Sequence, residues 1–146
     1  RSILRRTMFG FVFQFGQLVP ELTVEDNVAL PLLLNKKDKK EAYKKAKRWI
    51  AEVGLSGKEN NLPGELSGGQ AQRVAIARAM VIEPQILFAD EPTGSLDTFN
   101  SEKVMELFIK TVKEYGTTVI MVTHEPSIAA YADREIVVRD GKIVGE

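Results

Sequence analysis

Two acidic residues, Asp90 and Glu91, follow a short apolar run at residues 86–89 and offer the chemistry that nucleotide hydrolysis requires. One carboxylate in such a place can organise Mg²⁺, usually through water, because this ion keeps an octahedral shell. The adjacent carboxylate can polarise an attacking water. The pair also has a purely structural interpretation, as an acidic cluster that complements the dipole of a following helix.

Two other apolar runs also end in polar residues. Gln14 closes one near the N-terminus, and His124, the only histidine of the chain, follows a β-branched one. Neither predicts a function alone, since a lone histidine at the end of a strand is more often structural. Ligands of open parallel sheets bind at the carboxyl ends of strands. The convergence of these two ends with Asp90 and Glu91 therefore predicts a site.

A pair of glycines opens a predicted helix between these runs. The sequence there is Leu66, Ser67, Gly68, Gly69 and Gln70, with Ser67 as the expected N-cap and Gln70 three residues later. Each glycine costs a helix about 1 kcal/mol, so the pair calls for an explanation. One explanation is that an anion closely approaches the free N–H groups at the helix N-terminus. This explanation predicts a phosphate site.

The apolar runs are the strands that we expect to carry these residues: 8–14, 86–89 and 117–123. The first alternates Phe9, Phe11 and Phe13 with smaller residues, which predicts an aromatic-faced core strand. The other two are continuously apolar, which is typical of strands buried on both faces.

Helices are expected over about residues 24–34, 39–53, 67–82 and 98–115. Thr23 and Asp38 are the expected N-caps of the first two, and Gly54 and Gly116 close the second and the fourth. Pro31 is expected to end or kink the first helix, because proline removes a backbone donor and clashes with the preceding turn.

The order of these elements predicts an α/β fold with a mostly parallel sheet, since strands alternate with helices. Residues 16–82 contain no convincing strand and are interpreted as an inserted helical subdomain. Near the C-terminus, Asp140 and Gly141 separate two short β-prone runs and predict a hairpin.

Composition narrows the class of protein. The chain has 146 residues, with 20 Lys and Arg, 20 Asp and Glu, and no Cys. The zero formal charge gives no electrostatic reason to expect nucleic acid, and the lack of cysteine excludes a disulfide scaffold or a thiolate zinc site. No apolar run approaches the roughly 18 residues that a membrane span needs.

Five segments together resemble the motifs of the ABC-type ATPases. The run LSGGQAQRVAIARAM is similar to their signature motif, and ILFADEP to their Walker B strand with its adjacent glutamate. The D-loop, the switch histidine and the Q-loop are matched by Ser95-Leu96-Asp97, His124 and Phe13-Gln14. Order and spacing agree over essentially the whole chain.

The resemblance implies a P-loop NTPase-like, or RecA-like, α/β fold whose parallel sheet core holds an inserted α-helical subdomain. Residues 1–15 and 84–146 would form part of the core, and residues 16–83 the helical subdomain that carries the signature. The Walker A sequence GxxxxGK[ST] is not found in these residues. Because the chain starts with Arg1, we expect an N-terminal truncation that lacks the P-loop strand and an antiparallel β-subdomain.

In the family, the P-loop strand lies inside the sheet, between the strands that match residues 117–123 and 135–139. Its loss would leave strand groups and apolar surface open, which favours association. We therefore expect that the 146-residue chain alone does not turn over ATP. We also expect it to close the gap, swap elements or self-associate.

The function that the resemblance implies is ATP binding and hydrolysis by the subunit that powers a membrane permease, with ATP and Mg²⁺ as cofactors. Two such domains would sandwich ATP head to tail. The signature of one would bind the γ-phosphate of the ATP held by the other, through Ser67, Gly68, Gly69 and Gln70.

Roles in catalysis follow from the same resemblance. Glu91 would act as general base, and Asp90 would help to hold Mg²⁺. Gln14 would contact Mg²⁺ and the attacking water, and His124 would grip the γ-phosphate. The D-loop residues would be Ser95, Leu96 and Asp97, the last communicating across the dimer.

Two stretches, FGQLVPELTVEDNVALPLLL and ADEPTGSLD, most resemble the branch that serves lipoprotein release, macrolide efflux, antimicrobial-peptide export and cell division. The expected partners are a second ATPase subunit and an integral membrane permease that docks on the helical segment. Neither nucleic acid nor direct membrane insertion is expected. The expected location is the cytoplasm, at the inner face of the cell membrane through the permease.

Three alternatives stay open. A DNA-maintenance ATPase shares the signature but predicts a long coiled coil before it, and residues 14–66 hold no sustained heptads. A translation-linked ABC protein would carry a second signature copy elsewhere. A truncated module that only binds its partners would be distinguished by the reading frame upstream of Arg1.

Overall fold

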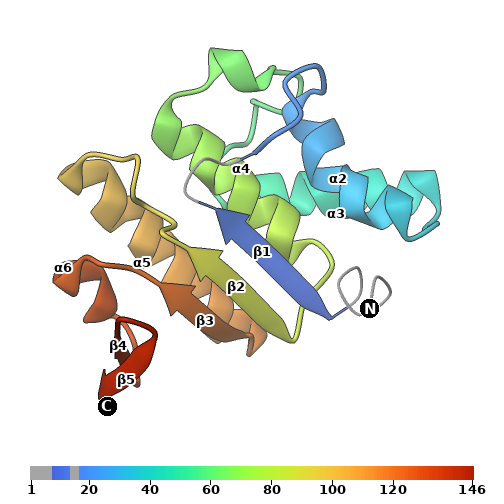
Figure 1. Ribbon diagram of the computed structural model, residues 1–146. Helices are drawn as coiled ribbons and strands as arrows, with labels where there is room; N and C mark the ends of the chain where they lie inside the picture. Colours follow the sequence, from blue (N-terminus) through green and yellow to red (C-terminus); the bar gives the residue numbers. More distant parts are fainter. Residues whose placement is uncertain (1–7, 14–16) are drawn as a thin grey trace.

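The computed structural model describes residues 8–13 and 17–146 (Figure 1). Three strands form a parallel sheet in the order β1-β2-β3: β1 (Phe9–Phe13), β2 (Ile86–Asp90) and β3 (Thr118–Val122). Their last residues, Phe13, Asp90 and Val122, lie side by side in the register. The carboxyl ends of all three strands therefore meet at one edge, and the predicted parallel α/β fold is confirmed.

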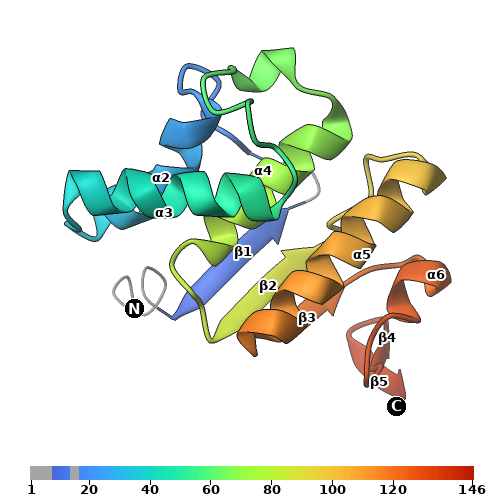
Figure 2. The same cartoon turned by 180° about the vertical axis from the view of Figure 1, so that it is seen from behind.

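Two helices cover one face of this sheet, α4 (Gly68–Met80) and α5 (Thr98–Tyr115). Figures 1 and 2 show both helices on the same side, and no described helix lies on the other. The buried residues of α5 recur at helical spacing, as Val104, Phe108 and Val112 do. They pack into one core with the buried side of β2.

Between β1 and β2, the described residues form helices and no strand: α2 (Val24–Leu34), α3 (Lys39–Glu52), the short 3₁₀ helix η1 (Pro63–Glu65) and α4. The predicted N-caps are confirmed, since Thr23 accepts from the Asp26 N–H at 3.1 Å and Asp38 from the Glu41 N–H at 3.2 Å. Gly54 ends α3 with a φ of 77°, the left-handed conformation that glycine allows.

The sequence predicts that α2 ends or kinks at Pro31, and the first of these alternatives is wrong. The helix continues to Leu34, and the Asn35 N–H still donates to the Pro31 carbonyl at 3.2 Å. The other end of α2 is held from outside, because the Val24 N–H donates to the Asn61 carbonyl at 2.8 Å. Packing and these external bonds outweigh the local preference of proline.

The segment that leads into α2 is fixed by one buried side chain, Asn27. Its Oδ1 accepts from the Val19 N–H at 2.8 Å, and its Nδ2 donates to the carbonyls of Val19, Leu22 and Thr23 at 3.0–3.1 Å. A fully buried amide with every group paired gives the segment one defined course over the helices.

Strand β1 buries its small residues and not its aromatic ones, so the expected aromatic-faced core strand is corrected. Gly10 and Val12 are buried against the helices, whereas the three phenylalanines are only partly buried. A Cβ at Gly10 would lie 2.9 Å from the Ala79 carbonyl oxygen, so only glycine lets α4 approach this closely. The aromatic rings lie on the uncovered face, where Phe11 stacks on Phe88 with centroids 5.4 Å apart.

Strand β2 is buried on one face only, and no residue of β3 is fully buried, whereas the sequence predicts that both strands are buried on both faces. Leu87 and Ala89 of β2 are buried, but Ile120 and Val122 of β3 are 50% and 60% exposed. The reason is that no described element covers the second face. Among the described residues β3 pairs with β2 alone, so its other edge is open.

The chain ends in a short helix, α6 (Pro126–Ala129), and a hairpin of β4 (Val137–Arg139) and β5 (Lys142–Gly145). Asp140 and Gly141 take φ values of 51° and 74°, as a type I′ turn requires, so the predicted hairpin is confirmed. It forms a sheet separate from β3 in the described structure. None of the described helices has the length and apolarity that a membrane crossing requires.

Candidate active site

Glu91 lies directly after β2, at the carboxyl edge of the sheet. Its backbone N–H donates to the Val122 carbonyl at 2.8 Å, so the chain is still bonded to β3 as it turns away. Its φ is 46°, a left-handed conformation that a residue with a Cβ seldom adopts. The side chain is 18% exposed. This turn sets the carboxylate at the rim, facing the residues that follow β3.

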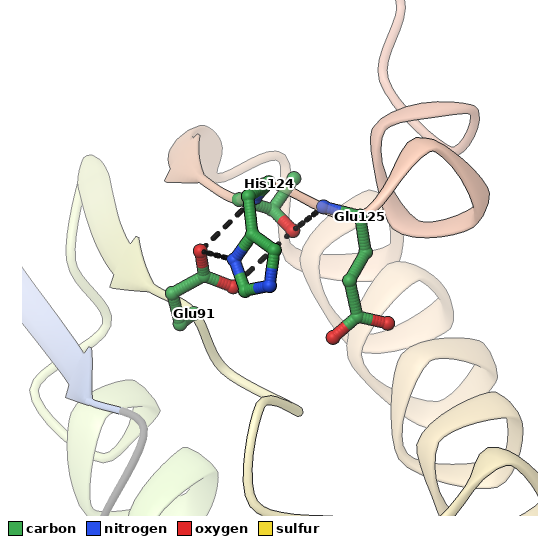
Figure 3. A network of polar contacts seen from close by, with 4 residues as sticks. Glu91, His124 and Glu125 are labelled. Carbon is green, nitrogen blue, oxygen red and sulfur yellow. Dashed lines mark hydrogen bonds and ion pairs between the residues drawn. The ribbon is translucent and has the colours of Figure 1, made fainter.

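Donors from those residues converge on the carboxylate (Figure 3). The His124 backbone N–H donates to Oε1 of Glu91 at 3.0 Å, and the imidazole Nδ1 lies 2.5 Å from the same oxygen. The hydroxyl of Thr123 donates to Oε2 at 3.4 Å. An ionised carboxylate only accepts hydrogen bonds, so Nδ1 is the ring nitrogen that carries a proton. The side chain of Glu125 points away from Glu91 in Figure 3.

The charge of Glu91 acts on the titration of His124. The hydrogen bond to Glu91, and then the negative charge of that carboxylate, raise the pKa of His124 above its ordinary value of 6.5. The ring itself is well exposed, at 81% of its side chain, so solvent screens the pair. The contact sets the proton and orientation of the imidazole more than it stabilises the fold.

Asp90 is the last residue of β2 and is exposed at the same edge. The described residues contain no cluster of three or more His, Cys, Asp or Glu side chains that could hold a metal by itself. Mg²⁺ needs only one or two protein carboxylates, since water and phosphate oxygens complete its shell. Asp90 provides one such carboxylate, exposed at this edge, so its chemistry fits this ion. Gln14, the other predicted metal contact, lies outside the described residues.

The predicted glycine-rich helix start is built as expected. Ser67 caps α4 by accepting from the Gln70 N–H at 3.2 Å, and the Gln70 side chain accepts from the Ser67 N–H at 3.0 Å. A Cβ on Gly68 would lie 3.3 Å from the Leu96 side chain, and one on Gly69 would lie 3.4 Å from Oδ1 of Asn100. The glycines therefore also serve close packing against Leu96 and the start of α5.

The segment matching the D-loop forms the N-terminal cap of α5. Asp97 accepts from the Asn100 N–H at 2.8 Å and from the Asn100 side-chain amide at 2.9 Å. These donors favour the ionised form and lower the pKa of Asp97. Leu96 lies against Gly68, and Ser95 precedes it in the same turn. The structure thus brings the predicted site residues together in two separate groups. Glu91 contacts His124, and the signature contacts the D-loop.

Gln72 is a functional candidate that sequence reasoning missed. Its side chain is 3% exposed, and its Nε2 donates to the carbonyls of Phe13 at 3.0 Å and Pro92 at 2.5 Å. The one signal in the sequence was the position of Gln72, a polar residue on the same face of the helix as Gly69 and Ile76, which are buried. Its partners are backbone atoms, which no residue pattern reveals.

Known proteins match this chain over nearly its whole length. A family model described as ABC transporter matches residues 2–94. The chain is 51% identical over 145 residues to the lipoprotein-releasing system ATP-binding protein LolD of Aquifex aeolicus, covering 99% of this chain and 64% of LolD. It is 52% identical over 145 residues to the macrolide export ATP-binding/permease protein MacB of Neisseria gonorrhoeae, covering 99% of this chain and 22% of MacB. The chain therefore spans less than two thirds of these relatives.

Solved structures give the same answer for the fold. A dimeric post-hydrolysis state of the ATP-binding cassette MJ0796, bound to ADP and Pi, matches with a TM-score of 0.83 and 41% identity, over 97% of this chain and 63% of that one. The protein cbiO1 of Clostridium perfringens matches with a TM-score of 0.88 and 32% identity, over 98% and 57%. Family match, relatives and fold confirm the resemblance seen in the motifs, including its lipoprotein-release and macrolide branch. On these grounds the chain belongs to the ABC transporter family.

Proposed function

We propose that this chain is the catalytic part of an ATP-hydrolysing subunit that powers a membrane permease. The observation that carries the proposal is the contact of Glu91 with His124 at the ends of adjacent strands. Membership of the family supports it, as does the similarity to MJ0796, a cassette seen with ADP and Pi.

Glu91 is the proposed general base, which accepts a proton from the water that attacks the γ-phosphate. Its carboxylate is held by the backbone N–H and imidazole of His124, so its orientation is set before a substrate arrives. His124 is the proposed contact to the γ-phosphate, for which its raised pKa favours the positively charged form. The two residues thus place a base and a cation at one edge of the sheet.

Asp90 is the proposed protein ligand of Mg²⁺, with Gln14 as a second contact to the ion and to the attacking water. When bound, Mg²⁺ neutralises developing charge on the phosphates. The exposed position of Asp90 next to Glu91 supports this assignment, because an ion there would lie beside the base.

The signature residues Ser67, Gly68, Gly69 and Gln70 are proposed to bind the γ-phosphate of ATP held by a second subunit, head to tail. Their position at the capped N-terminus of α4, a 13-residue helix, supports this, since N–H groups and the helix dipole favour anions there. Leu96 of the D-loop lies against this helix start. The D-loop residues Ser95, Leu96 and Asp97 are proposed to communicate across the dimer.

The permease is proposed to dock on the helical subdomain, residues 16–83, while residues 1–15 and 84–146 contribute to the ATPase core. The names of LolD and MacB refer to lipoprotein release and macrolide export, which supports an exporter of lipoprotein or drug. A peptide cargo and a site of action at the cytoplasmic face of the membrane are proposed from the resemblance of the motifs alone. The cargo itself is chosen by the permease.

The test is phosphate release from ATP by the complete protein in which these residues occur. We expect release that falls to background when EDTA removes divalent metal and returns when excess Mg²⁺ is added, because the phosphates need that charge. A complete protein that releases no phosphate from ATP, alone or with its permease, would contradict the proposal.

A further inference from the structure

Gln72 is buried in an otherwise apolar part of α4, where the next residues on the buried side include Val74, Ala75 and Ile76. An amide placed among such residues is unfavourable unless its polar groups are paired. Its two N–H groups find their partners outside the helix. This makes Gln72 a link between elements as well as a core residue.

The two partners come from segments far apart in the sequence. Nε2 of Gln72 donates to the carbonyl oxygen of Phe13, the last residue of β1, at 3.0 Å. The same nitrogen donates to the carbonyl oxygen of Pro92, just beyond β2, at 2.5 Å. One side-chain amide therefore ties α4 to the carboxyl ends of two neighbouring strands.

Both carbonyls stand next to proposed catalytic residues in the chain. Phe13 directly precedes Gln14, and Pro92 directly follows Glu91. Because peptide units are planar, holding a carbonyl also holds the peptide bond to the next residue. The ring of Pro92 fixes its own φ, so its position also restrains the peptide that it shares with Glu91.

Helix α4 carries the signature one turn before Gln72. Gly69 and Gln72 are three residues apart and both buried, so they lie on the same face. Along that face α4 rests first on Asn100, through Gly69, and then on the Pro92 carbonyl, through Gln72. These contacts connect the helix start directly to the segment that follows Glu91.

We propose that Gln72 is a positioning residue for ATP hydrolysis, through which the signature helix holds the main-chain carbonyls of Phe13 and Pro92, the latter next to Glu91. The inference rests on the proposed function, because it concerns the geometry of that same site. Gln72 acts through two carbonyl oxygens and not through contact with the reacting atoms.

The test compares Gln72→Met with Gln72→Lys in the complete protein. Met has a similar length but no donor, so both carbonyls lose their partner, whereas the Lys ammonium has three N–H groups and can serve both. We expect Gln72→Met to lower kcat at least about tenfold, since small misplacements of catalytic groups cost that much. KM for ATP should stay within about twofold, and Gln72→Lys should recover most of the lost kcat.

Thr111→Val is the matched structural control. Thr111 is buried on α5, where its Oγ1 donates to the Leu107 carbonyl at 2.7 Å, several helical turns from the carboxyl edge of the sheet. Its loss removes a buried hydrogen bond to a backbone carbonyl, as in Gln72→Met. We expect a lower Tm with kcat unchanged, which separates loss of stability from loss of positioning.

An unchanged kcat in folded Gln72→Met, beside an active parent, would overturn this role and leave the proposed function standing. Equal kcat values for the Met and Lys variants would overturn it too. If Gln72→Met does not fold, Gln72→Lys decides: kcat within about threefold of the parent at unchanged KM supports the role, and a larger loss in the folded variant overturns it. A parent that does not hydrolyse ATP would overturn both proposals.

Discussion

At the scale of single residues, the central feature is the left-handed backbone of Glu91. A non-glycine residue at a φ of 46° carries strain on the order of 1 kcal/mol or more, which the surroundings must offset. They do so through its N–H bond to Val122 and the donors that His124 directs at its carboxylate. Glycine would relieve the strain but would remove the carboxylate. The strained backbone is therefore the consequence of having an acid at this turn.

The pairing of Glu91 with His124 predicts how the imidazole titrates. His124 is the only histidine, so one imidazole resonance in NMR reports its pKa. We expect a pKa above 6.5, and Glu91→Gln should lower it toward that value because the hydrogen-bonded charge is lost. In Glu125→Gln the pKa should change far less, since Glu125 is the smallest of the causes of the shift.

The raised pKa of His124 also determines how the contribution of this pair to folding stability changes with pH. The pair stabilises the folded state fully below the unfolded pKa of about 6.5, and this contribution is lost as pH rises through the higher folded pKa. The contribution is small because the ring is exposed. A His124 pKa at or below 6.5 in the parent protein would contradict the contact.

Residue types and strand ends were enough to predict that Glu91 and His124 meet, because parallel strands in register bring their carboxyl ends together. The contact of the signature glycines with Leu96 and Asn100 was not predicted. Nor was Gln72, because its partners are main-chain carbonyls contributed by residues distant in the sequence. Such links depend on packing, and no spacing rule reports them.

At the scale of elements, the close contact of β1 with α4 decides how the helical part is seated on the sheet. Gly10 faces the helix, and a Cβ there would meet the Leu87 side chain at 2.7 Å and the Ala79 carbonyl at 2.9 Å. Because α4 also carries Gln72, the distance between strand and helix controls the bond to Phe13. The glycine is thus required by close approach rather than by its φ.

Gly10→Ala should destabilise the complete protein, with Gly64→Ala as its matched control. Overpacking against a backbone oxygen costs about 1–3 kcal/mol, because the helix must move. Gly64 has open space around its Cβ position, so Gly64→Ala should be neutral or stabilise by up to about 1 kcal/mol. Urea unfolding of the three proteins measures the difference, and equal midpoints for both variants would refute the packing argument.

The sequence was enough to predict where the helices and strands lie, but not which of their faces are buried. Caps and terminal glycines marked the helices correctly, but the alternation in β1 was interpreted with the wrong face inward. Aromatic bulk suggested a core, yet the close helix needed the small residues Gly10 and Val12. The apolar run of β3 likewise met no covering layer among the described residues, which leaves Ile120 and Val122 exposed.

At the scale of the whole molecule, one face of the sheet combines an open strand edge with exposed apolar side chains. Ile120 and Val122 share this face with the rings of Phe11 and Phe88, which stack on each other. The register places Phe11, Phe88 and Ile120 level across the three strands. An apolar face beside an unpaired edge favours association.

We therefore predict that the 146-residue chain, produced alone, associates through this face. Ile120→Lys with Val122→Lys should reduce the association, because charge on this face opposes its burial. Leu34→Lys is the control, since Leu34 is 58% exposed on α2, away from the sheet. Light scattering after size exclusion gives the mass of each form. A monomeric parent chain, or an equal effect of Leu34→Lys, would contradict the prediction.

The most direct measurement is the kcat for ATP of the complete protein with Glu91→Gln, beside Glu125→Gln as the matched control. The control removes an equivalent carboxylate that points away from the site (Figure 3). We predict that Glu91→Gln lowers kcat by at least about 100-fold with ATP binding retained, the scale expected for loss of a general base, and that Glu125→Gln stays within about twofold of the parent. A Glu91→Gln variant that keeps the parent's kcat would contradict the account.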